Sequence, residues 1–133
     1  MIEKTFLASE DTLNDAIAFV EEQLEAADCP MKLVMQITVC FEEMYVNVAH
    51  YAYNGDAGEV VVTADYQDGL FSIRLADKGF PFDPLAKADP DITLSAEERN
   101  IGGLGIYMVK KSMDVVNYEY RDGQNIFTMG KRF

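Results

Sequence analysis

The 133-residue chain is long enough for one hydrophobic core, and we expect residues 1–133 to form a single domain. Its 23 acidic and 11 basic residues give a net charge of -12, which argues against direct binding to nucleic acid or an anionic membrane and favours a basic protein partner. The sequence has no run of about 18 apolar residues and no basic leader followed by an apolar stretch, so it predicts a cytoplasmic protein. Cys29 and Cys40 form no CxxC pair and there is one histidine, so neither a disulfide framework nor a zinc site is indicated.

The first part of the chain predicts one strand and two helices. KTFLAS, residues 4–9, is a short strand candidate, and the helix expected over 9–26 carries apolar residues at helical spacing. Pro30 occupies a position that the first turn of a helix tolerates. It opens the longest predicted helix, over 30–53, which has an apolar stripe along one face.

The rest of the chain predicts two pairs of strands with a long segment and a helix between them. Alternating apolar runs in 59–77 flank Asp68 and Gly69, and a second Asp-Gly turn lies at 122–123 between strands at 115–122 and 125–133. Residues 84–101 lack periodicity and are a lid candidate, and a helix is expected over about 105–113. This order predicts an α+β fold, a two-layer sandwich with helices on one face of a mixed, mostly antiparallel sheet.

Three glycines, Gly102, Gly103 and Gly105, surround Leu104 where the last helix begins. A dinucleotide fingerprint would need a third glycine at Met108, and a P-loop would need Gly-Lys-Ser/Thr, so both motifs are excluded. Glycines at a helix start expose main-chain N–H groups that can bind a phosphate. The alternative is a junction that needs a positive φ or tight packing, where glycine clusters are common.

A polar line runs along the long helix beside its apolar stripe. Glu43, Asn47 and His50 follow one another at spacings of four and three, which places them on one helical face. A glutamate can act as a general base, and an asparagine oxygen can bind Mg²⁺. The alternative is a polar edge on a half-buried helix.

A third polar segment, LADKGFPFDP, ends the second strand of the first pair. Asp77 could accept a hydrogen bond from an exocyclic amine, and Gly79 would let a flat ring lie against the backbone. The alternative is an ordinary turn at the end of a strand.

In this order and at these separations, EEMYVNVAHYAY, DKGFPFDP and GGLGIYMVKKSMD resemble the three ATP-site motifs of the GHKL ATPases. The closest resemblance is to the stand-alone anti-sigma-factor serine kinases, whose domain has about this length. Tyr51 departs from their pattern, because it stands between the His and the Ala of the first motif.

The resemblance implies an ATP site with Mg²⁺ as cofactor. Glu43 would be the general base, Asn47 would hold Mg²⁺, and His50 follows on the same helix within the ATP site. Asp77 would bind the adenine amine, with Gly79 giving the ring room.

The resemblance also assigns the phosphate end and one more adenine contact. Gly102, Gly103, Leu104 and Gly105 would offer main-chain amides to the phosphates, with 84–101 closing as a lid. Arg99, at the end of the lid, would reach a phosphate or partner, or be a solvated charge. The threonine that assists adenine binding in such folds corresponds to Thr128 or is replaced by Asn125.

Three functions follow as hypotheses. The first is an anti-sigma factor with serine/threonine kinase activity, which sequesters a sigma factor and phosphorylates a STAS-type antagonist. The second is a nucleotide-gated binding module without phosphotransfer. The third is a detached histidine-kinase catalytic domain, which ranks last because His50 lies within the ATP-site helix. The resemblance also suggests a homodimer.

Overall fold

The computed structural model of the chain describes residues 1–86 and 103–133. The lid expected over 84–101 therefore lies outside the described residues beyond position 86. The same holds for Arg99, for Gly102 and for the side chain of Leu104.

The elements follow the order expected from the sequence. They are β1 (Ile2–Leu7), the short 3-10 helix η1 (Glu10–Thr12), α1 (Leu13–Ala26), α2 (Met31–Tyr51), β2 (Glu59–Gln67), β3 (Leu70–Asp77), α3 (Gly103–Ser112), β4 (Val115–Arg121) and β5 (Gln124–Arg132). The helix expected over 9–26 begins as a 3-10 turn, because the Ser9 hydroxyl accepts a hydrogen bond from the amide of Asp11 at 3.1 Å.

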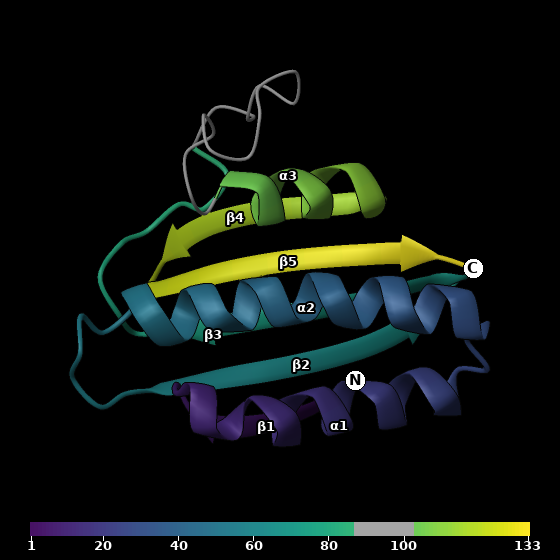
Figure 1. The fold of residues 1–133 in the computed structure, drawn as a ribbon, viewed down its shortest axis with the longest axis horizontal. Helices are drawn as coiled ribbons and strands as arrows, with labels where there is room; N and C mark the ends of the chain where they lie inside the picture. Colours follow the sequence, from purple (N-terminus) through teal and green to yellow (C-terminus); the bar gives the residue numbers. More distant parts are fainter. Residues whose placement is uncertain (87–102) are drawn as a thin grey trace.

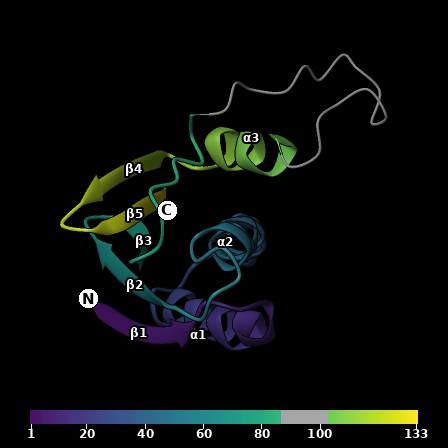
Figure 2. The ribbon, with the colours of Figure 1, turned by 90° about the vertical axis from the view of Figure 1, so that its left-hand side faces the viewer.

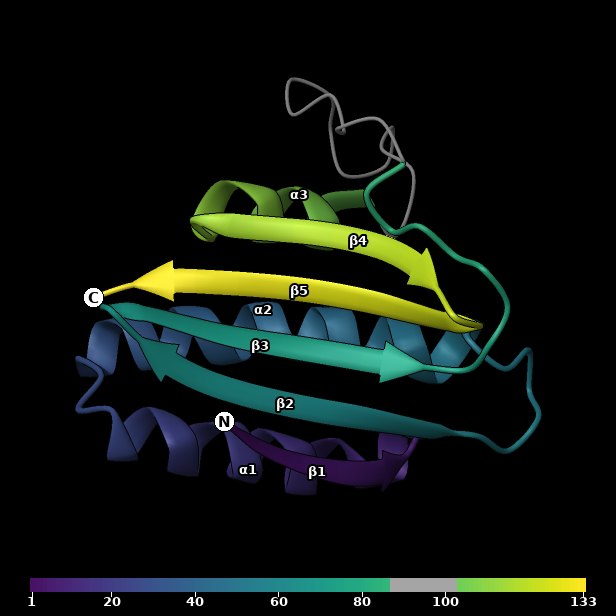
Figure 3. The same cartoon turned by 180° about the vertical axis from the view of Figure 1, so that it is seen from behind.

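The strands form one sheet in the order β1-β2-β3-β5-β4 (Figure 3). All four pairings are antiparallel, so the sheet of the described residues contains none of the parallel pairs that a mixed sheet would allow. Both Asp-Gly turns have positive φ at the two residues, at 68–69 and at 122–123, as the sequence predicted. The second hairpin brings β5 back between β3 and β4.

The three helices cover one face of this sheet, with α2 between α1 and α3 (Figures 1 and 2). The expected two-layer α+β sandwich is therefore confirmed. Strand alternation sends one set of side chains toward the helices, including Ile73 and Leu75 of β3, which share one buried cluster with Phe41 and Tyr45 of α2. Among the described helices, none has both the length and the apolarity needed to cross a bilayer.

The sheet register fixes the position of the polar site. Asp77, the last residue of β3, lies opposite Asn125, the second residue of β5. Both side chains point to the helix-covered face, because they keep the alternation of the buried Leu75 and Phe127. Two polar groups therefore sit side by side at the end of the core, beneath the C-terminal half of α2.

Candidate functional site

The carboxylate of Asp77 is buried at the end of β3, where it is 4% exposed. Its Oδ1 accepts hydrogen bonds from the amide of Gly79 and from Nδ2 of Asn125, both at 2.9 Å. Among the described residues no donor reaches Oδ2. Burial raises the pKa of the Asp77 carboxyl, and the hydrogen bonds from Asn125 and the Gly79 amide partly offset the rise. The second oxygen of this largely buried carboxyl is thus left without a donor from the described residues.

Asn125 uses its whole hydrogen-bonding capacity to hold Asp77 and the following loop. Its Nδ2 donates to Asp77 Oδ1 and, at 2.7 Å, to the carbonyl of Phe80. Its Oδ1 accepts from the amide of Phe82 at 3.0 Å and from the Tyr118 hydroxyl. Asn125 is 5% exposed, so this network is a buried and fully satisfied support for the carboxylate.

Thr128, the other residue considered for this position, does not lie beside Asp77. It pairs in register with Arg74 of β3 and Asn117 of β4. Because strand residues alternate between faces, a residue three positions after Asn125 points to the opposite side of the sheet. The choice of Thr128 as a pocket residue was therefore wrong, and the structure places Asn125 there instead.

Asn47 lies on α2 at the same pocket. Its Nδ2 donates to the backbone carbonyl of Glu43 at 2.7 Å and approaches Glu43 Oε1 at 3.4 Å. The pocket is a cavity of about 20 Å³ whose lining includes Asn47, Asp77, Asn125, Tyr118 and Phe82. That volume holds roughly one water molecule, so the pocket must widen before a larger ligand can enter.

Glu43 meets the start of α3. A Cβ at Gly105 would overlap the carboxyl carbon of Glu43, so this carboxylate lies against the first turn of α3 where the helix has no side chain. The positive end of the helix dipole favours a carboxylate there. Two segments singled out in the sequence, at 43 and at 105, are therefore neighbours in space.

Close packing against the end of α2 requires a glycine at position 79. A Cβ at this position would overlap the carbonyl oxygen of Ala52, and the next amide, Phe80 N, donates to that oxygen at 2.7 Å. The glycine thus lets the loop after β3 close on the end of α2. From the sequence, Gly79 was expected either to make room for a bound ring or to belong to an ordinary turn at the end of a strand.

His50 points away from this pocket. Its Nε2 lies 2.6 Å from Oε1 of Glu10 in η1, and both side chains are largely exposed. The neighbouring Tyr51 ring instead contacts Phe82, with 5.4 Å between centroids. The last turn of α2 therefore places His50 outside the cavity that Asn47 and Asp77 share, contrary to its expected role there.

Tyr118 also lines the pocket, and it was not predicted from the sequence. The hairpin turn at 122–123 was a usable signal, because it pairs Tyr120 with Asn125 and so places Tyr118 on the same face of the sheet. Nothing in the sequence indicated that the tyrosine hydroxyl would bond the asparagine.

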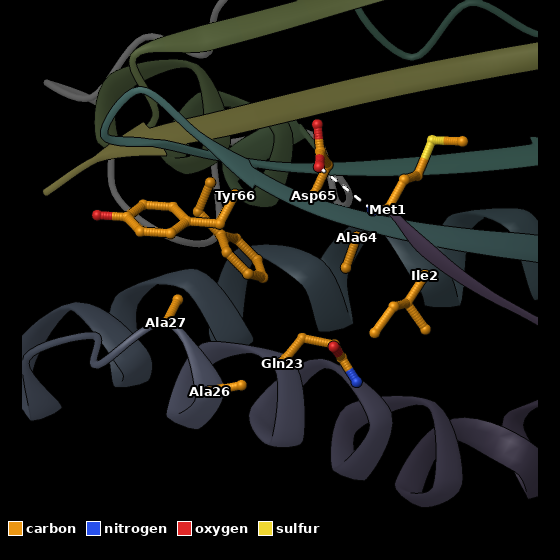
Figure 4. A pocket seen from close by; sticks show the side chains of 9 residues that line it. Met1, Ile2, Gln23, Ala26, Ala27, Ala64, Asp65 and Tyr66 are labelled. Carbon is orange, nitrogen blue, oxygen red and sulfur yellow. Dashed lines mark ion pairs between the residues drawn. The ribbon is translucent and has the colours of Figure 1, made fainter.

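A second, larger hollow of about 290 Å³ opens between β1, β2 and the end of α1 (Figure 4). Its lining is mostly apolar and consists of Met1, Ile2, Gln23, Ala26, Ala27, Ala64, Asp65, Tyr66 and Phe71. Phe71 precedes Asp77 by six residues on β3, which is roughly 20 Å along the strand. The hollow is separate from the polar pocket.

The sequence model of the histidine kinase-like ATPase domain matches residues 6–131 of the chain. The chain belongs to this ATPase domain family. Among its relatives, the serine/threonine-protein kinase BtrW of Bordetella bronchiseptica is 25% identical over 119 residues, which cover 89% of this chain and 84% of BtrW. The serine-protein kinase RsbW of Bacillus cereus is 26% identical over 97 residues, and the match spans 70% of this chain but only 61% of RsbW.

Solved structures agree on the fold. The Acinetobacter baumannii histidine kinase AdeS superposes with a TM-score of 0.51 over 99% of this chain and 68% of its own, at 12% identity. In this ATPase domain, the described residues contain no group of three or more His, Cys, Asp or Glu side chains able to hold a metal. A cation at Asn47 would therefore need oxygen ligands from a bound substrate.

Proposed function

We propose that the pocket between α2 and the ends of β3 and β5 binds the adenine of ATP. The support is Asp77, a buried carboxylate whose Oδ1 is held by two donors while no described donor reaches Oδ2. The exocyclic amine of adenine is a donor that suits such an acceptor, because a hydrogen-bond donor stabilises a carboxylate oxygen in a largely desolvated position. Asn125 would then act as a positioning residue, since its own bonds are all used.

The triphosphate would run from this pocket toward the start of α3. Asn47 lines the pocket, and its Nδ2 already donates to Glu43, which leaves its carboxamide oxygen for Mg²⁺. Mg²⁺ would neutralise phosphate charge, with phosphate oxygens as its further ligands. Main-chain amides of the glycine-rich segment at 102–105 would bind the phosphates, and the segment at 84–101 would close over them as a lid.

Glu43 is the proposed general base for phosphotransfer. Its carboxylate lies against the first turn of α3, where the phosphates would end. It would take the proton of a serine or threonine hydroxyl while that oxygen bonds to the γ-phosphorus. The bond from the γ-phosphorus to the bridging oxygen would break, and ADP would leave.

The kinase names of the relatives BtrW and RsbW support a protein substrate. We infer that the chain is an anti-sigma factor that sequesters a sigma factor and phosphorylates a STAS-type antagonist in the cytoplasm. Its net charge of -12 suits a basic transcription factor as the sequestered partner and disfavours direct contact with DNA or an anionic membrane. A single domain over 1–133 and a homodimer remain part of this proposal.

Intact-mass measurement tests the kinase function. The purified protein is incubated with Mg-ATP and a panel of STAS domains, and one domain should gain one phosphate. Glu43→Gln should abolish this gain and keep ATP binding, because Asn47 retains an oxygen acceptor at position 43. Transfer that survives in the variant would contradict the assigned base.

One observation favours a second function, a nucleotide-gated binding module. The pocket holds roughly one water molecule, so adenine entry requires it to widen, and we expect the loop that Asn125 and Tyr118 hold through Phe82 to be the part that moves. ATP binding would then alter the surface near Phe82 even without phosphotransfer. Tight ATP binding with no phosphate transfer to any partner in the panel would favour this function over the kinase.

A further inference from the structure

The outer face of α2 carries an apolar stripe that the core does not use. Met31, Met35 and Val39 repeat at spacings of four and are 73%, 64% and 49% exposed. The core-facing residues of the same helix, such as Ile37 and Met44, are buried on the opposite side. Three apolar side chains in one row on a solvent-facing helix surface are typical of a contact site. We call these three residues the α2 stripe.

Exposed carboxylates gather on α1, the helix that packs beside α2. The segment 5–31 contains no lysine or arginine, and its acidic residues are all exposed: Glu10, Asp11, Asp15, Glu21, Glu22, Glu25 and Asp28. The C-terminal half of α1 lies beside the N-terminal half of α2, because only residues 27–30 connect them (Figure 1). Glu42 adds an exposed carboxylate three residues after Val39, and Lys32 is the only lysine or arginine of α2.

We propose that the α2 stripe docks a basic amphipathic helix of the protein partner. Apolar side chains of that helix would pack on the two methionines and the valine, whose flexible or small side chains suit an irregular partner surface. Its lysines and arginines would face the carboxylates of α1 and Glu42. A second copy of this chain is a poor occupant of the stripe itself, because the exposed carboxylates of α1 and Glu42 on the two copies would repel one another there.

The α2 stripe lies on the same helix as the proposed base. The role of the docked partner therefore rests on the proposed kinase function. Val39 precedes Glu43 by one helical turn on α2. When the partner's helix is docked on the stripe, the parts of the partner that adjoin this helix would therefore lie near the Glu43 carboxylate.

A synthetic peptide tests the docking surface directly. The probe has about 18 residues, roughly five helical turns, with leucine along one face and lysine on the other, and carries a fluorophore for anisotropy. The control peptide has the same composition in scrambled order. The ordered peptide should bind at least about tenfold more tightly, and equal affinity of the two peptides would overturn the proposal.

Charged substitutions in the stripe separate apolar docking from simple charge attraction. The double variant Met35→Glu/Val39→Glu removes apolar contact and adds two negative charges. If the peptide docks on the stripe, this variant should bind it at least about tenfold more weakly. The matched control is Ile2→Glu with Leu7→Glu on β1, where both side chains are 52% exposed, and it should bind like the parent. Unchanged or tighter binding by the stripe variant would show that charge alone attracts the peptide.

Two further readouts complete the test. Glu21→Gln with Glu25→Gln should weaken binding and reduce its salt dependence, and no change in either would contradict the role of the α1 carboxylates. If the stripe substitutions instead convert a dimer to a monomer in sedimentation, the stripe is an interface between copies and the proposal fails. Calorimetry with ATP on the same variants should show unchanged affinity, so loss of docking and failure of the proposed ATP site are told apart.

Discussion

The two ends of the proposed ATP site are built differently. At the base end, Asp77 and Asn125 are buried, lie in register on neighbouring strands and are linked by a complete hydrogen-bond network. At the phosphate end, Glu43 and Asn47 are half-buried on one helix and share weaker contacts. The base end is therefore preorganised by the sheet, whereas the phosphate end depends on groups that a ligand would bring together.

Asp77→Asn should show the largest functional effect, because it breaks the base end without breaking the fold. The carboxamide keeps an acceptor for Asn125 and Gly79 but turns its amine toward the amine of adenine, so ATP binding should fall by at least about 100-fold. Calorimetry measures this loss. An ATP affinity within about threefold of the parent would contradict the assignment.

The same variant should be more stable than the parent at neutral pH. Because burial raises the pKa of Asp77, its ionisation opposes folding, and the stability present at low pH is lost as pH rises through the folded pKa. Urea unfolding at several pH values should show a gain for Asp77→Asn at pH 7 that disappears in acid. Asp122→Asn, in an exposed turn, is the control and should show no such gain.

Asn125→Ala should damage both the fold and the base end. It removes one hydrogen bond each from Tyr118, the Phe82 amide and Asp77, at a cost of about 2 to 3 kcal/mol in the free energy of unfolding. ATP affinity should fall as Asp77 loses its support. Thr128→Ala is the matched control on the other face of β5, and a larger loss of ATP affinity there than in Asn125→Ala would reverse the assignment.

Gly105→Ala should affect the phosphate end alone. The added methyl group displaces the Glu43 carboxyl, which is the movable end of a side chain, so the phosphotransfer rate should fall about tenfold. Alanine also favours a helix by about 1 kcal/mol, so thermal stability should hold or rise. Gly79→Ala is the contrast, because its methyl group meets the Ala52 carbonyl and should destabilise the fold by about 1 to 3 kcal/mol.

His50→Ala should have the smallest effect. The exposed pair with Glu10 contributes at most about 1 kcal/mol, and the imidazole lies outside the pocket, so ATP affinity should stay the same. Thermal unfolding and calorimetry check both points. A marked loss of ATP affinity in His50→Ala would show that His50 does contribute to ATP binding.

The fold was largely predictable from the sequence, because its signals are local. Helical spacing located α1 and α2, and the two Asp-Gly pairs located both hairpins. The family resemblance correctly indicated the ATPase domain. The match over residues 6–131 confirms this.

The details of the site depended on contacts between distant segments, which single-sequence patterns do not encode. Whether Asn125 or Thr128 faces the pocket depends on the phase of β5 relative to β3. The orientation of His50 depends on Glu10, forty residues away, and the packing role of Gly79 depends on Ala52. The near-closed pocket is lined in part by the loop that Asn125 holds, and no spacing rule indicates that contact.

The most direct test compares ATP with GTP by titration calorimetry on the unmodified chain with Mg²⁺. GTP places a carbonyl oxygen where ATP has its amine, so it would set an acceptor against the Asp77 carboxylate. We expect measurable heat and a defined affinity for ATP and at least about 100-fold weaker binding of GTP. Equal affinities for the two nucleotides, or no heat with ATP, would contradict the proposed role of Asp77 as the adenine acceptor.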